Sequence, residues 1–335
     1  MNPSPELRLM RLANAFQLSR AVQVAARLRL GELLGDGPRS CAELAAETAT
    51  QERVLHKLLR FLGDLGVVEE RADGTFAGTE VSERLFLVDN IAQGEESAAA
   101  WGGLLGSLAD GEPAFPAIHG RTFYEHAAAH PDRGRAFAAW NRILGGPLGP
   151  ALGKTLNLTP GGTLVDLGGG DGSVLASILQ EHPACRGVLV DLPEAVVDAP
   201  EILRDAGVES RCRVMAGDVR GDLPEGQDAY LLCRVLLNWD DGEAEAWLRR
   251  IRDAMGPESR LFVVEELMPG PGEPRGAALA SSDLHLFLMW GGGHRTFEEM
   301  DALLERCGLE RTDLDRVGGG DDGPHLLTAR RSGGT

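Results

Sequence analysis

Five short apolar runs in the second half of the chain constrain its fold more than any other feature. The runs span residues 163–167, 187–192, 213–218, 229–233 and 261–266. Each is apolar almost throughout rather than alternating, which is typical of strands buried on both faces of a parallel sheet. Helical stretches separate them, and a further pair near 309–316 and 324–329 would complete the sheet. The pattern predicts a Rossmann-like α/β domain over residues 161–335.

The first 90 residues follow a different pattern, in which apolar residues recur at helical spacing, as in "AVQVAARLRLGELL". Ser40 and Glu43 have the spacing of a capping box at the start of another helix. The later stretch "RADGTFAGT" places an Asp-Gly turn between two short extended pieces. Together they predict a mainly helical winged-helix domain over residues 1–90. The helical spacing of aromatic residues in "FYEHAAAHPDRGRAFAAW" predicts a helical linker and cap over 91–160.

The charge of the chain argues against the DNA binding that a winged helix often performs. Its 33 Lys and Arg residues against 51 Asp and Glu residues give a net charge of −18, which repels phosphate backbones and anionic membrane surfaces. The expected second and third helices mix basic with acidic residues, so no basic stripe forms; these residues are Arg53, Lys57, Arg60, Glu43, Glu47, Glu52 and Asp64. We expect neither nucleic acid nor a membrane as a partner, and a winged-helix regulatory protein stays a distant alternative.

The sequence also bears on location and on metal binding. No apolar run approaches the roughly 20 residues that a membrane helix needs, and the first residues lack the pattern of a secretory signal. A cytoplasmic protein is therefore expected. The five cysteines are scattered and show no C-x-x-C spacing, so the sequence predicts neither a disulfide framework nor a metal site.

The stretch "VDLGGGDGS" follows the first expected strand and opens a helix, which is where a nucleotide-type ligand meets a doubly wound sheet. Gly168 and Gly170 would let the backbone approach such a ligand closely. Ser173 takes the place of the third glycine of the dinucleotide fingerprint, and no phosphate-binding lysine follows. The loop therefore favours a ligand without a pyrophosphate.

Two aspartates end the next two expected strands. Asp191 is positioned to accept hydrogen bonds from the two hydroxyls of a ribose, and Asp218, in "AGDV", can accept one from an adenine amino group. Each feature alone has a structural explanation, since glycines make tight turns and aspartates cap helices. Three such features at the ends of three successive strands favour a cofactor site. S-adenosylmethionine has ribose and adenine without phosphate, and its cationic sulfonium suits an acidic chain.

Nearly the whole chain resembles the plant-type small-molecule O-methyltransferases and their bacterial natural-product relatives. The resemblance is carried by "VLHKLLRFLGDLGVVEE", "LVDLGGGDGSVLASILQEHP", "VDLPEAV", "LLNWDD" and "GGGHRTFEEM". It implies a class I methyltransferase domain behind a winged-helix dimerisation domain, a homodimer, and a small aromatic substrate. It also implies cofactor contacts by Val219 and by Cys233, where lysine or arginine is more usual, with Arg234 as a candidate to compensate.

Catalysis is where the chain departs from this family. Anchoring the family's L-H-D-W segment on Trp239 puts Leu237 at the catalytic histidine and Asn238 at the aspartate. His294 stands where the family usually has a glutamate, while Glu265 matches its other supporting carboxylate. The "LLNW" version resembles the anthracycline branch, the group of carminomycin O-methyltransferases and aclacinomycin hydroxylases, which implies a polycyclic aromatic, polyketide-type substrate.

Methyl transfer is possible without the histidine. Holding the acceptor oxygen in line contributes roughly 7 to 11 kcal/mol, whereas a general base adds about 10²- to 10⁴-fold. We therefore predict O-methylation of a phenolic hydroxyl chiefly by proximity and desolvation. Asn238 would orient the acceptor, with His294 and Glu265 as polar assistants. The predicted acceptor contacts, besides Asn238, are Trp140, Asn141, Met289 and Trp290.

Two alternatives stay open on the sequence alone. The same scaffold can retain the cofactor and perform hydroxylation, decarboxylation or rearrangement instead of methyl transfer. His294 can be a base, because an imidazole titrates near roughly pH 6.5, or a structural residue of the loop "GGGHR". His285, within "SSDLHLFLMW", is more simply explained as a packed helix residue than as a base.

Overall fold

The chain forms two compact units in the computed structural model, which describes residues 4–218, 221, 223–274, 276–318 and 323–333. The smaller unit holds Met1–Ala98 and His130–Trp140, and the larger one holds Ala99–Ala129 and Asn141–Thr335. The helical segment expected over 91–160 does not form a unit of its own. Part of it is tied to the smaller unit by the ion pairs of Arg133, and part packs on a helix of the larger unit. Its role as a cap stays a prediction.

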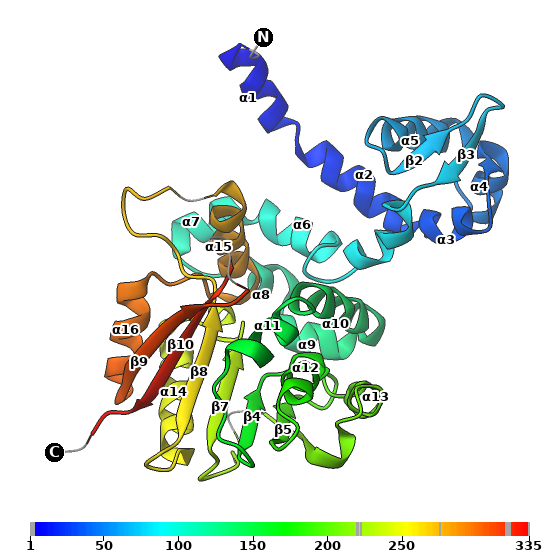
Figure 1. Ribbon diagram of the computed structural model, residues 1–335. Coiled ribbons are helices and arrows are strands. Elements are labelled where there is room, and N and C mark those ends of the chain that lie inside the picture. Colours follow the sequence, from blue (N-terminus) through cyan, green and yellow to red (C-terminus); the bar gives the residue numbers. More distant parts are fainter. Residues whose placement is uncertain (1–3, 219–220, 222, 275, 319–322, 334–335) are drawn as a thin grey trace. The chain divides into compact units, whose positions relative to one another are not determined.

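The smaller unit has the helices and the β-wing expected from the sequence (Figure 1). Its elements are α1 (Pro5–Ala13), α2 (Phe16–Arg27), α3 (Leu30–Gly35), β1 (Arg39–Ser40), α4 (Cys41–Glu47), α5 (Glu52–Asp64), β2 (Val68–Glu70), β3 (Thr75–Gly78) and the 3₁₀ turn η1 (Ser82–Val88). The capping box of Ser40 and Glu43 is present at the start of α4. The three strands are antiparallel in the order β1-β3-β2. The mainly helical winged-helix prediction is confirmed.

Helical spacing of leucines builds the core of this unit. Leu55, Leu59 and Leu62 lie on one face of α5 and are buried together with Leu30 and Phe76. Each fully buried leucine or phenylalanine stabilises the fold by about 1.5 to 3 kcal/mol relative to an exposed one. The strand of the wing that carries Phe76 therefore packs against the helices.

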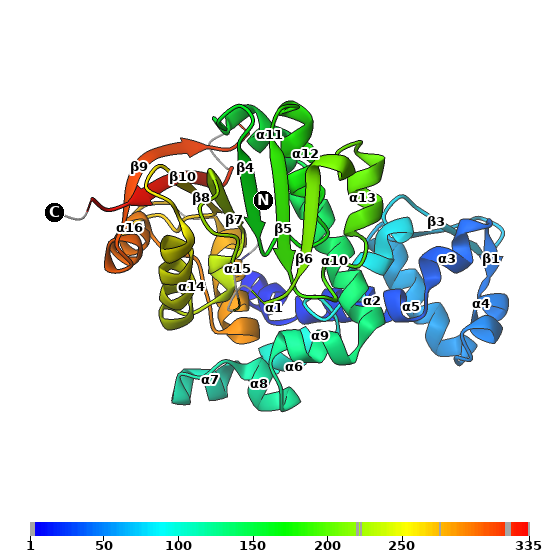
Figure 2. The same cartoon turned by 90° about the horizontal axis from the view of Figure 1, so that it is seen from below.

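A seven-stranded sheet forms the centre of the larger unit, in the order β6-β5-β4-β7-β8-β10-β9 (Figures 1 and 2). The strands are β4 (Thr163–Leu167), β5 (Arg186–Asp191), β6 (Cys212–Ala216), β7 (Ala229–Cys233), β8 (Arg260–Glu265), β9 (Leu309–Arg316) and β10 (His325–Arg331). β4 to β8 are parallel, and β10 is antiparallel to both of its neighbours. β4 to β8 lie at the five apolar runs, and β9 and β10 lie at the predicted final pair, each within two residues of the expected bounds, so the Rossmann-like prediction is confirmed.

Both faces of this sheet are covered, because successive side chains of a strand point to opposite faces. Val165 and Leu167 belong to the core shared with α14 (Asp241–Ala254) and α16 (Phe297–Arg306). Leu164 belongs to the core of the other face, with α11 (Leu148–Thr155), α12 (Ser173–Glu181) and α13 (Ala199–Asp205). The other α-helices after the β-wing are α6 (Glu95–Gly102), α7 (Leu104–Asp110), α8 (Ala114–His119), α9 (Phe123–Ala129), α10 (Pro131–Gly145) and α15 (Ala277–Trp290). Of these, α6 and α10 are divided between the two units.

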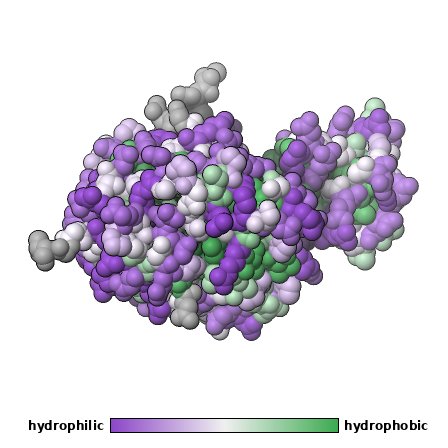
Figure 3. All heavy atoms as spheres, turned by 60° about the horizontal axis from the view of Figure 1, so that its bottom comes forward, coloured by the Kyte–Doolittle hydropathy of each residue, from purple (hydrophilic) through white to green (hydrophobic). Residues whose placement is uncertain are grey.

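The surface in Figure 3 is largely hydrophilic, in keeping with the net charge of −18. Within the described residues, no helix combines the length and the apolar character needed to cross a membrane. The same residues contain no cluster of three or more His, Cys, Asp or Glu side chains placed to hold a metal ion.

Candidate active site

The glycine-rich loop lies at the point where the strand order of the sheet reverses. β4 pairs with β5 on one side and with β7 on the other, and in open α/β sheets ligands bind at the carboxyl ends of the strands beside such a point. Gly168 and Gly170 have φ of 71° and 59°, which a glycine adopts without strain. A Cβ added at Gly170 would meet no atom within 4 Å. The loop therefore has a free backbone face at the predicted cofactor position.

Asp191 joins this loop to the end of β5. Its Oδ2 accepts a hydrogen bond from the Gly170 N–H at 2.7 Å, and its Oδ1 accepts one from the Leu192 N–H at 2.7 Å. Burial raises the pKa of the carboxyl group, the two N–H donors lower it, and the neighbouring charges of Glu194 and Asp218 raise it. The structure thus brings Asp191 and Asp218 to one edge of the sheet with Gly170. Each carboxylate oxygen has a second lone pair that can accept a hydroxyl.

Asp166, within β4, is a residue of this site that the sequence analysis did not select. It is 1% exposed, and neither carboxylate oxygen has a hydrogen-bond partner among the described residues. Burial, with the charges of Asp191 and Asp171, raises its pKa from 3.8 to about 7. A buried carboxyl group without a partner is costly, so a carboxylate here favours a positively charged ligand. The available signal was an acidic residue inside an otherwise apolar run.

These residues fit S-adenosylmethionine. A cation beside Asp166 would stabilise the ionised carboxylate, the space at Gly170 admits a ligand, and Asp191 and Asp218 supply acceptors for hydroxyl and amino groups. Cys233 is the last residue of β7, and burial raises the pKa of its thiol, which keeps it neutral. Arg234 has φ of 58° and forms an ion pair with Glu266 at 2.6 Å. Val219, also a predicted contact, lies outside the described residues.

The turn after β7 contains Leu237 and Asn238 and is held from both sides. Oε1 of Glu265 accepts the backbone N–H groups of Val235 at 3.1 Å, Leu236 at 2.8 Å and Leu237 at 3.4 Å. The Arg295 guanidinium donates to the carbonyl oxygens of Leu236 at 2.9 Å and Trp239 at 2.8 Å. A turn whose donors and acceptors are both satisfied by buried charged groups is rigid, so its side chains are presented in one fixed arrangement.

Glu265 is buried and only partly satisfied. Its other carboxylate oxygen, Oε2, has no hydrogen-bond partner among the residues that the structure describes. Burial raises the pKa of Glu265 to about 7 against the opposing effects of Arg234 and the backbone donors. Leu237, whose backbone N–H donates to Oε1 of Glu265, is 6% exposed. Glu265 is therefore a buried, partly unsatisfied carboxyl group next to Leu237, and its catalytic role stays a prediction.

His294 lies in a tight set of contacts rather than in a loose loop. Its Nδ1 is 3.0 Å from the Glu266 carbonyl oxygen, its Nε2 is 3.0 Å from Ser282 Oγ, and its backbone N–H donates to Asp283 at 2.7 Å. The carbonyl requires a proton on Nδ1, so Nε2 accepts the serine hydroxyl. Burial lowers the pKa of the imidazole. With both nitrogens engaged, the structural reading of His294 is favoured, and its role as a base stays a prediction.

Asn238 is hydrogen-bonded to the hydroxyl of Tyr124, a residue of α9 that the sequence indicated only as helix packing. The Tyr124 ring stacks on Trp239 with centroids 5.7 Å apart. Burial and the charge of Asp191 raise the pKa of this phenol. Tyr124 therefore connects the turn of Asn238 with the edge of the sheet where Asp191 lies. Its place was not predictable from spacing, because α9 and the turn are far apart along the chain.

The remaining predicted acceptor residues have different environments. Met289 is fully buried in α15, and Trp290 at the end of the same helix packs on Phe123 with ring centroids 4.5 Å apart. Asn141 is exposed on α10. Trp140 belongs to the smaller unit, whereas the other candidates belong to the larger one. Acceptor binding by these residues stays a prediction.

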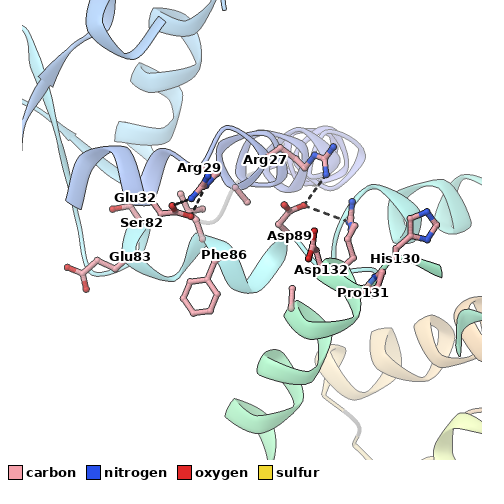
Figure 4. A pocket seen from close by; sticks show the side chains of 15 residues that line it. Arg27, Arg29, Glu32, Ser82, Glu83, Phe86, Asp89, His130, Pro131 and Asp132 are labelled. Carbon is pink, nitrogen blue, oxygen red and sulfur yellow. Dashed lines mark hydrogen bonds and ion pairs between the residues drawn. The ribbon is translucent and has the colours of Figure 1, made fainter. Parts of the chain in front are cut away.

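A separate cavity of about 540 Å³ lies within the smaller unit, between residues of α2, η1 and the start of α10 (Figure 4). Ion pairs cross its lining, since Arg27 and Arg133 lie 3.7 and 3.8 Å from Asp89. Arg133 also pairs with Glu96 at 2.6 Å. The lining residues include none of the predicted site residues within the described part of the chain.

Comparison with known proteins relates the two parts of the chain to known domains. Residues 10–89 match the O-methyltransferase dimerisation domain, and residues 101–310 match the O-methyltransferase domain. The mitomycin biosynthesis 6-O-methyltransferase of Streptomyces lavendulae is 34% identical over 87% of this chain and 85% of its own. The O-methyltransferase domain match includes both the glycine-rich loop and the turn of Leu237.

Solved structures agree with the sequence comparisons. The mitomycin 7-O-methyltransferase superposes with a TM-score of 0.88 at 31% identity, over 97% of each chain. The neocarzinostatin O-methyltransferase, solved with S-adenosylmethionine and 2-hydroxy-5-methyl naphthoic acid, has a TM-score of 0.81 at 26% identity, over 94% of this chain and 96% of its own. The chain therefore belongs to the family of S-adenosylmethionine-dependent O-methyltransferases, with the family's dimerisation domain followed by its methyltransferase domain.

Proposed function

We propose that this enzyme methylates a phenolic hydroxyl of a polycyclic aromatic natural product of the polyketide type, chiefly by proximity and desolvation. The observation that carries the proposal is the position of Tyr124, which is bonded to Asn238, stacked on Trp239 and electrostatically coupled to Asp191. An aromatic-walled acceptor site would thus adjoin the cofactor edge. The relative solved with a hydroxynaphthoic acid supports a fused-ring aromatic acceptor.

Gly168, Gly170, Asp191 and Asp218 would hold S-adenosylmethionine, with the Asp166 carboxylate supplying negative charge beneath the loop. When bound, the cofactor supplies an electrophilic methyl group on a sulfonium. The residues of this chain hold the acceptor oxygen near that group and exclude water from it. Positioning of this kind contributes roughly 7 to 11 kcal/mol to lowering the barrier.

The acceptor must release its proton without help from position 237. Leu237 carries no titratable group, and both nitrogens of His294 are bonded within the fold. A phenol that is already acidic, because its ring is conjugated to a carbonyl or quinone, loses its proton to water at neutral pH. Leu237 then contributes by keeping water away from the reacting oxygen, while the rigid turn and Asn238 orient the acceptor.

A homodimer in the cytoplasm is the proposed state of the enzyme. The match to the family's dimerisation domain supports it, and so does the apolar surface of the first two helices. Leu9, Met10 and Leu12 of α1 and Phe16 of α2 are 60 to 67% exposed, and exposed apolar patches of this kind mark protein interfaces. Sedimentation or light scattering of the purified chain tests this part of the proposal.

A second candidate is a reaction other than methyl transfer on the same scaffold, such as hydroxylation or decarboxylation. The absence of a titratable side chain at position 237 supports this second reaction as much as it supports methyl transfer, because the second reaction needs no base at the phenol. The cofactor would then remain as a fixed positive charge rather than a methyl donor.

Mass spectrometry separates the two candidates. The purified enzyme is incubated with S-adenosylmethionine and a panel of hydroxylated anthraquinones and anthracyclines. Product heavier by one methylene group, with an equal amount of S-adenosylhomocysteine, supports O-methylation. Any other mass change without S-adenosylhomocysteine supports the second candidate and contradicts the first. The Asp191→Ala variant, expected to lose the cofactor, is the control for background reaction.

A further inference from the structure

His285 is held in one tautomer by a neighbouring tryptophan. The indole N–H of Trp101, in α6, donates a hydrogen bond of 3.0 Å to Nδ1 of His285, in α15. The two rings are stacked with 17° between their planes. An indole nitrogen only donates, so Nδ1 must carry a lone pair. The neutral imidazole therefore carries its proton on Nε2.

The Nε2 atom is buried and has no hydrogen-bond partner among the described residues. Burial lowers the pKa of His285 to about 4, so the ring is neutral at physiological pH and Nε2–H is a donor. A buried donor without a partner is unfavourable for folding. Native proteins keep such groups chiefly where a ligand or a bound water meets them.

A series of contacting aromatic side chains connects this donor with the turn of Leu237 and Asn238. Trp290 lies edge-on to His285 with ring centroids 5.8 Å apart, and Phe123 packs on Trp290 with ring centroids 4.5 Å apart. Phe123 in turn contacts Tyr124 at 5.5 Å, and Tyr124 is bonded to Asn238. α15 also packs directly against the turn of Leu237 and Asn238. The donor thus belongs to the same aromatic group as the turn that would orient the acceptor.

We propose that His285 binds the acceptor, with its Nε2–H donating a hydrogen bond to a ring carbonyl oxygen of a quinone-type substrate. This inference rests on the proposed function, because it assigns a role within the acceptor site of that reaction. Nε2 already carries a proton, so His285 does not take the phenol proton. Instead, its hydrogen bond selects a substrate that carries a ring carbonyl. Such a carbonyl makes the phenolic hydroxyl more acidic, which the reaction needs if no side chain at position 237 removes the proton.

A matched pair of acceptors tests the proposal. 2-Hydroxyanthraquinone and 2-hydroxyanthracene present the same hydroxyl on the same ring framework, but only the first has carbonyl groups. His285→Leu removes the donor, and His285→Gln replaces it with an amide N–H. We expect His285→Leu to lower kcat/KM for the quinone by about 10- to 100-fold, chiefly through KM, and to leave the rate with 2-hydroxyanthracene nearly unchanged. His285→Gln should recover part of the loss.

Several outcomes would overturn the assignment. Equal losses with both acceptors, no loss with either, or turnover of neither acceptor would each contradict a carbonyl contact by His285. Methyl transfer to another aromatic acceptor would still support the proposed function in each of these cases. Binding of S-adenosylhomocysteine by calorimetry shows whether the variants remain folded. Nitrogen NMR of the histidine-labelled wild-type enzyme gives a second test, since a proton on Nδ1 rather than Nε2 of His285 would rule the proposal out.

Discussion

The hydroxyl of Tyr124 is hydrogen-bonded to the side chain of Asn238, and this bond joins helix α9 to the turn after strand β7. Asp191 lies close enough for its charge to raise the pKa of the same phenol. A single side chain thereby connects the edge of the sheet where Asp191 lies with the turn that contains Leu237. In the proposed reaction, the acceptor would be oriented between these two features.

Tyr124→Phe removes this bond and keeps the stacked ring. We expect kcat to fall about 10-fold, because Asn238 loses the partner that fixes its orientation. Asn238→Ala should cost a similar factor, and the double variant should cost little more than either single one, since residues of one network are not additive. Steady-state kinetics of the three variants measure the coupling. Fully additive losses would show that the bond has no part in positioning.

The buried carboxyl group of Asp166 should make stability depend on pH. Its pKa is raised to about 7 from 3.8, so the folded state binds a proton more tightly than the unfolded state does. The stabilisation is complete below roughly pH 4 and is lost as pH rises through about 7. Between pH 5 and pH 8, the free energy of unfolding should therefore fall by less in Asp166→Asn than in the wild type. The difference should be about 1 kcal/mol or more.

Denaturant titrations of the cofactor-free protein at several pH values measure this difference. The exposed Asp315, changed to Asn, is the matched control and should leave the pH dependence as it is. Identical pH profiles for wild type and Asp166→Asn would contradict the assignment of the effect to Asp166. Adding S-adenosylmethionine should flatten the wild-type profile, because a bound cation stabilises the ionised form of a nearby carboxylate.

Asp191 should be indispensable for the cofactor. Asp191→Ala removes the predicted ribose acceptor and leaves the Gly170 and Leu192 N–H groups without their partner. We expect S-adenosylhomocysteine to bind at least about 100-fold more weakly, since hydrogen bonds to charged groups contribute roughly 1.5 to 3 kcal/mol each. Asp191→Asn keeps one acceptor oxygen, so its affinity for S-adenosylhomocysteine should lie between those of the wild type and Asp191→Ala. Calorimetric titration checks the order, and unchanged binding in the alanine variant would place the ribose elsewhere.

The fold was predictable because its signals are local. Five strands of the large sheet are short, mostly apolar runs separated by helical stretches, which is the pattern of a parallel α/β sheet. The order of the strands depends on pairing between distant segments and was seen only in the structure. The carboxyl-end residues Asp191 and Asp218 could also be placed, because parallel strands end at the same edge. Asp166 was missed although it is an acidic residue inside an apolar run, because packing between distant segments decides whether such a side chain is buried without a partner.

The acceptor side could be predicted only in part, because it depends on contacts between distant segments. The partners of His294 come from α15 and from the residue after β8, and those of His285 from α6. The family motif places His294, whereas the sequence around His285 indicates only a packed helix residue, and hydrogen-bond partners for the nitrogens of either could not be predicted from the sequence. The bond between Tyr124 and Asn238 likewise depends on how α9 packs, which helical periodicity does not specify.

His294 should act through structure rather than as a base. In His294→Gln the amide can replace only part of the contacts to Glu266 and Ser282, so the melting temperature should fall by several degrees. The pH dependence of kcat between pH 6 and pH 9 should stay that of the wild type, because Nε2 accepts the serine hydroxyl in the folded protein. Loss of a limb near roughly pH 6 to 7 would instead identify His294 as the base.

Burial lowers the pKa of His294, which gives a second test of the same environment. The folded state binds a proton less readily than the unfolded state, so this residue favours folding above its ordinary pKa. That contribution is lost as pH falls below about 6.5. Acid sensitivity in this range should therefore be smaller in His294→Gln than in the wild type, as denaturant titrations at pH 5 and pH 7 would show.

Restoring the family's histidine gives the sharpest test of catalysis without a base. In Leu237→His the new imidazole stands beside Glu265, whose Oε2 has no hydrogen-bond partner among the described residues and can orient it. With a simple phenol, which loses its proton only near roughly pH 10, kcat should rise about 10-fold or more, since a general base contributes about 10²- to 10⁴-fold. With a hydroxyquinone, already ionised at neutral pH, kcat should stay the same or fall, because a polar side chain admits water. An equal rise with both acceptors would show that proton removal limits the wild-type reaction even for acidic phenols. Leu237→Asn, polar but not basic, is the control that separates the base from the change in polarity.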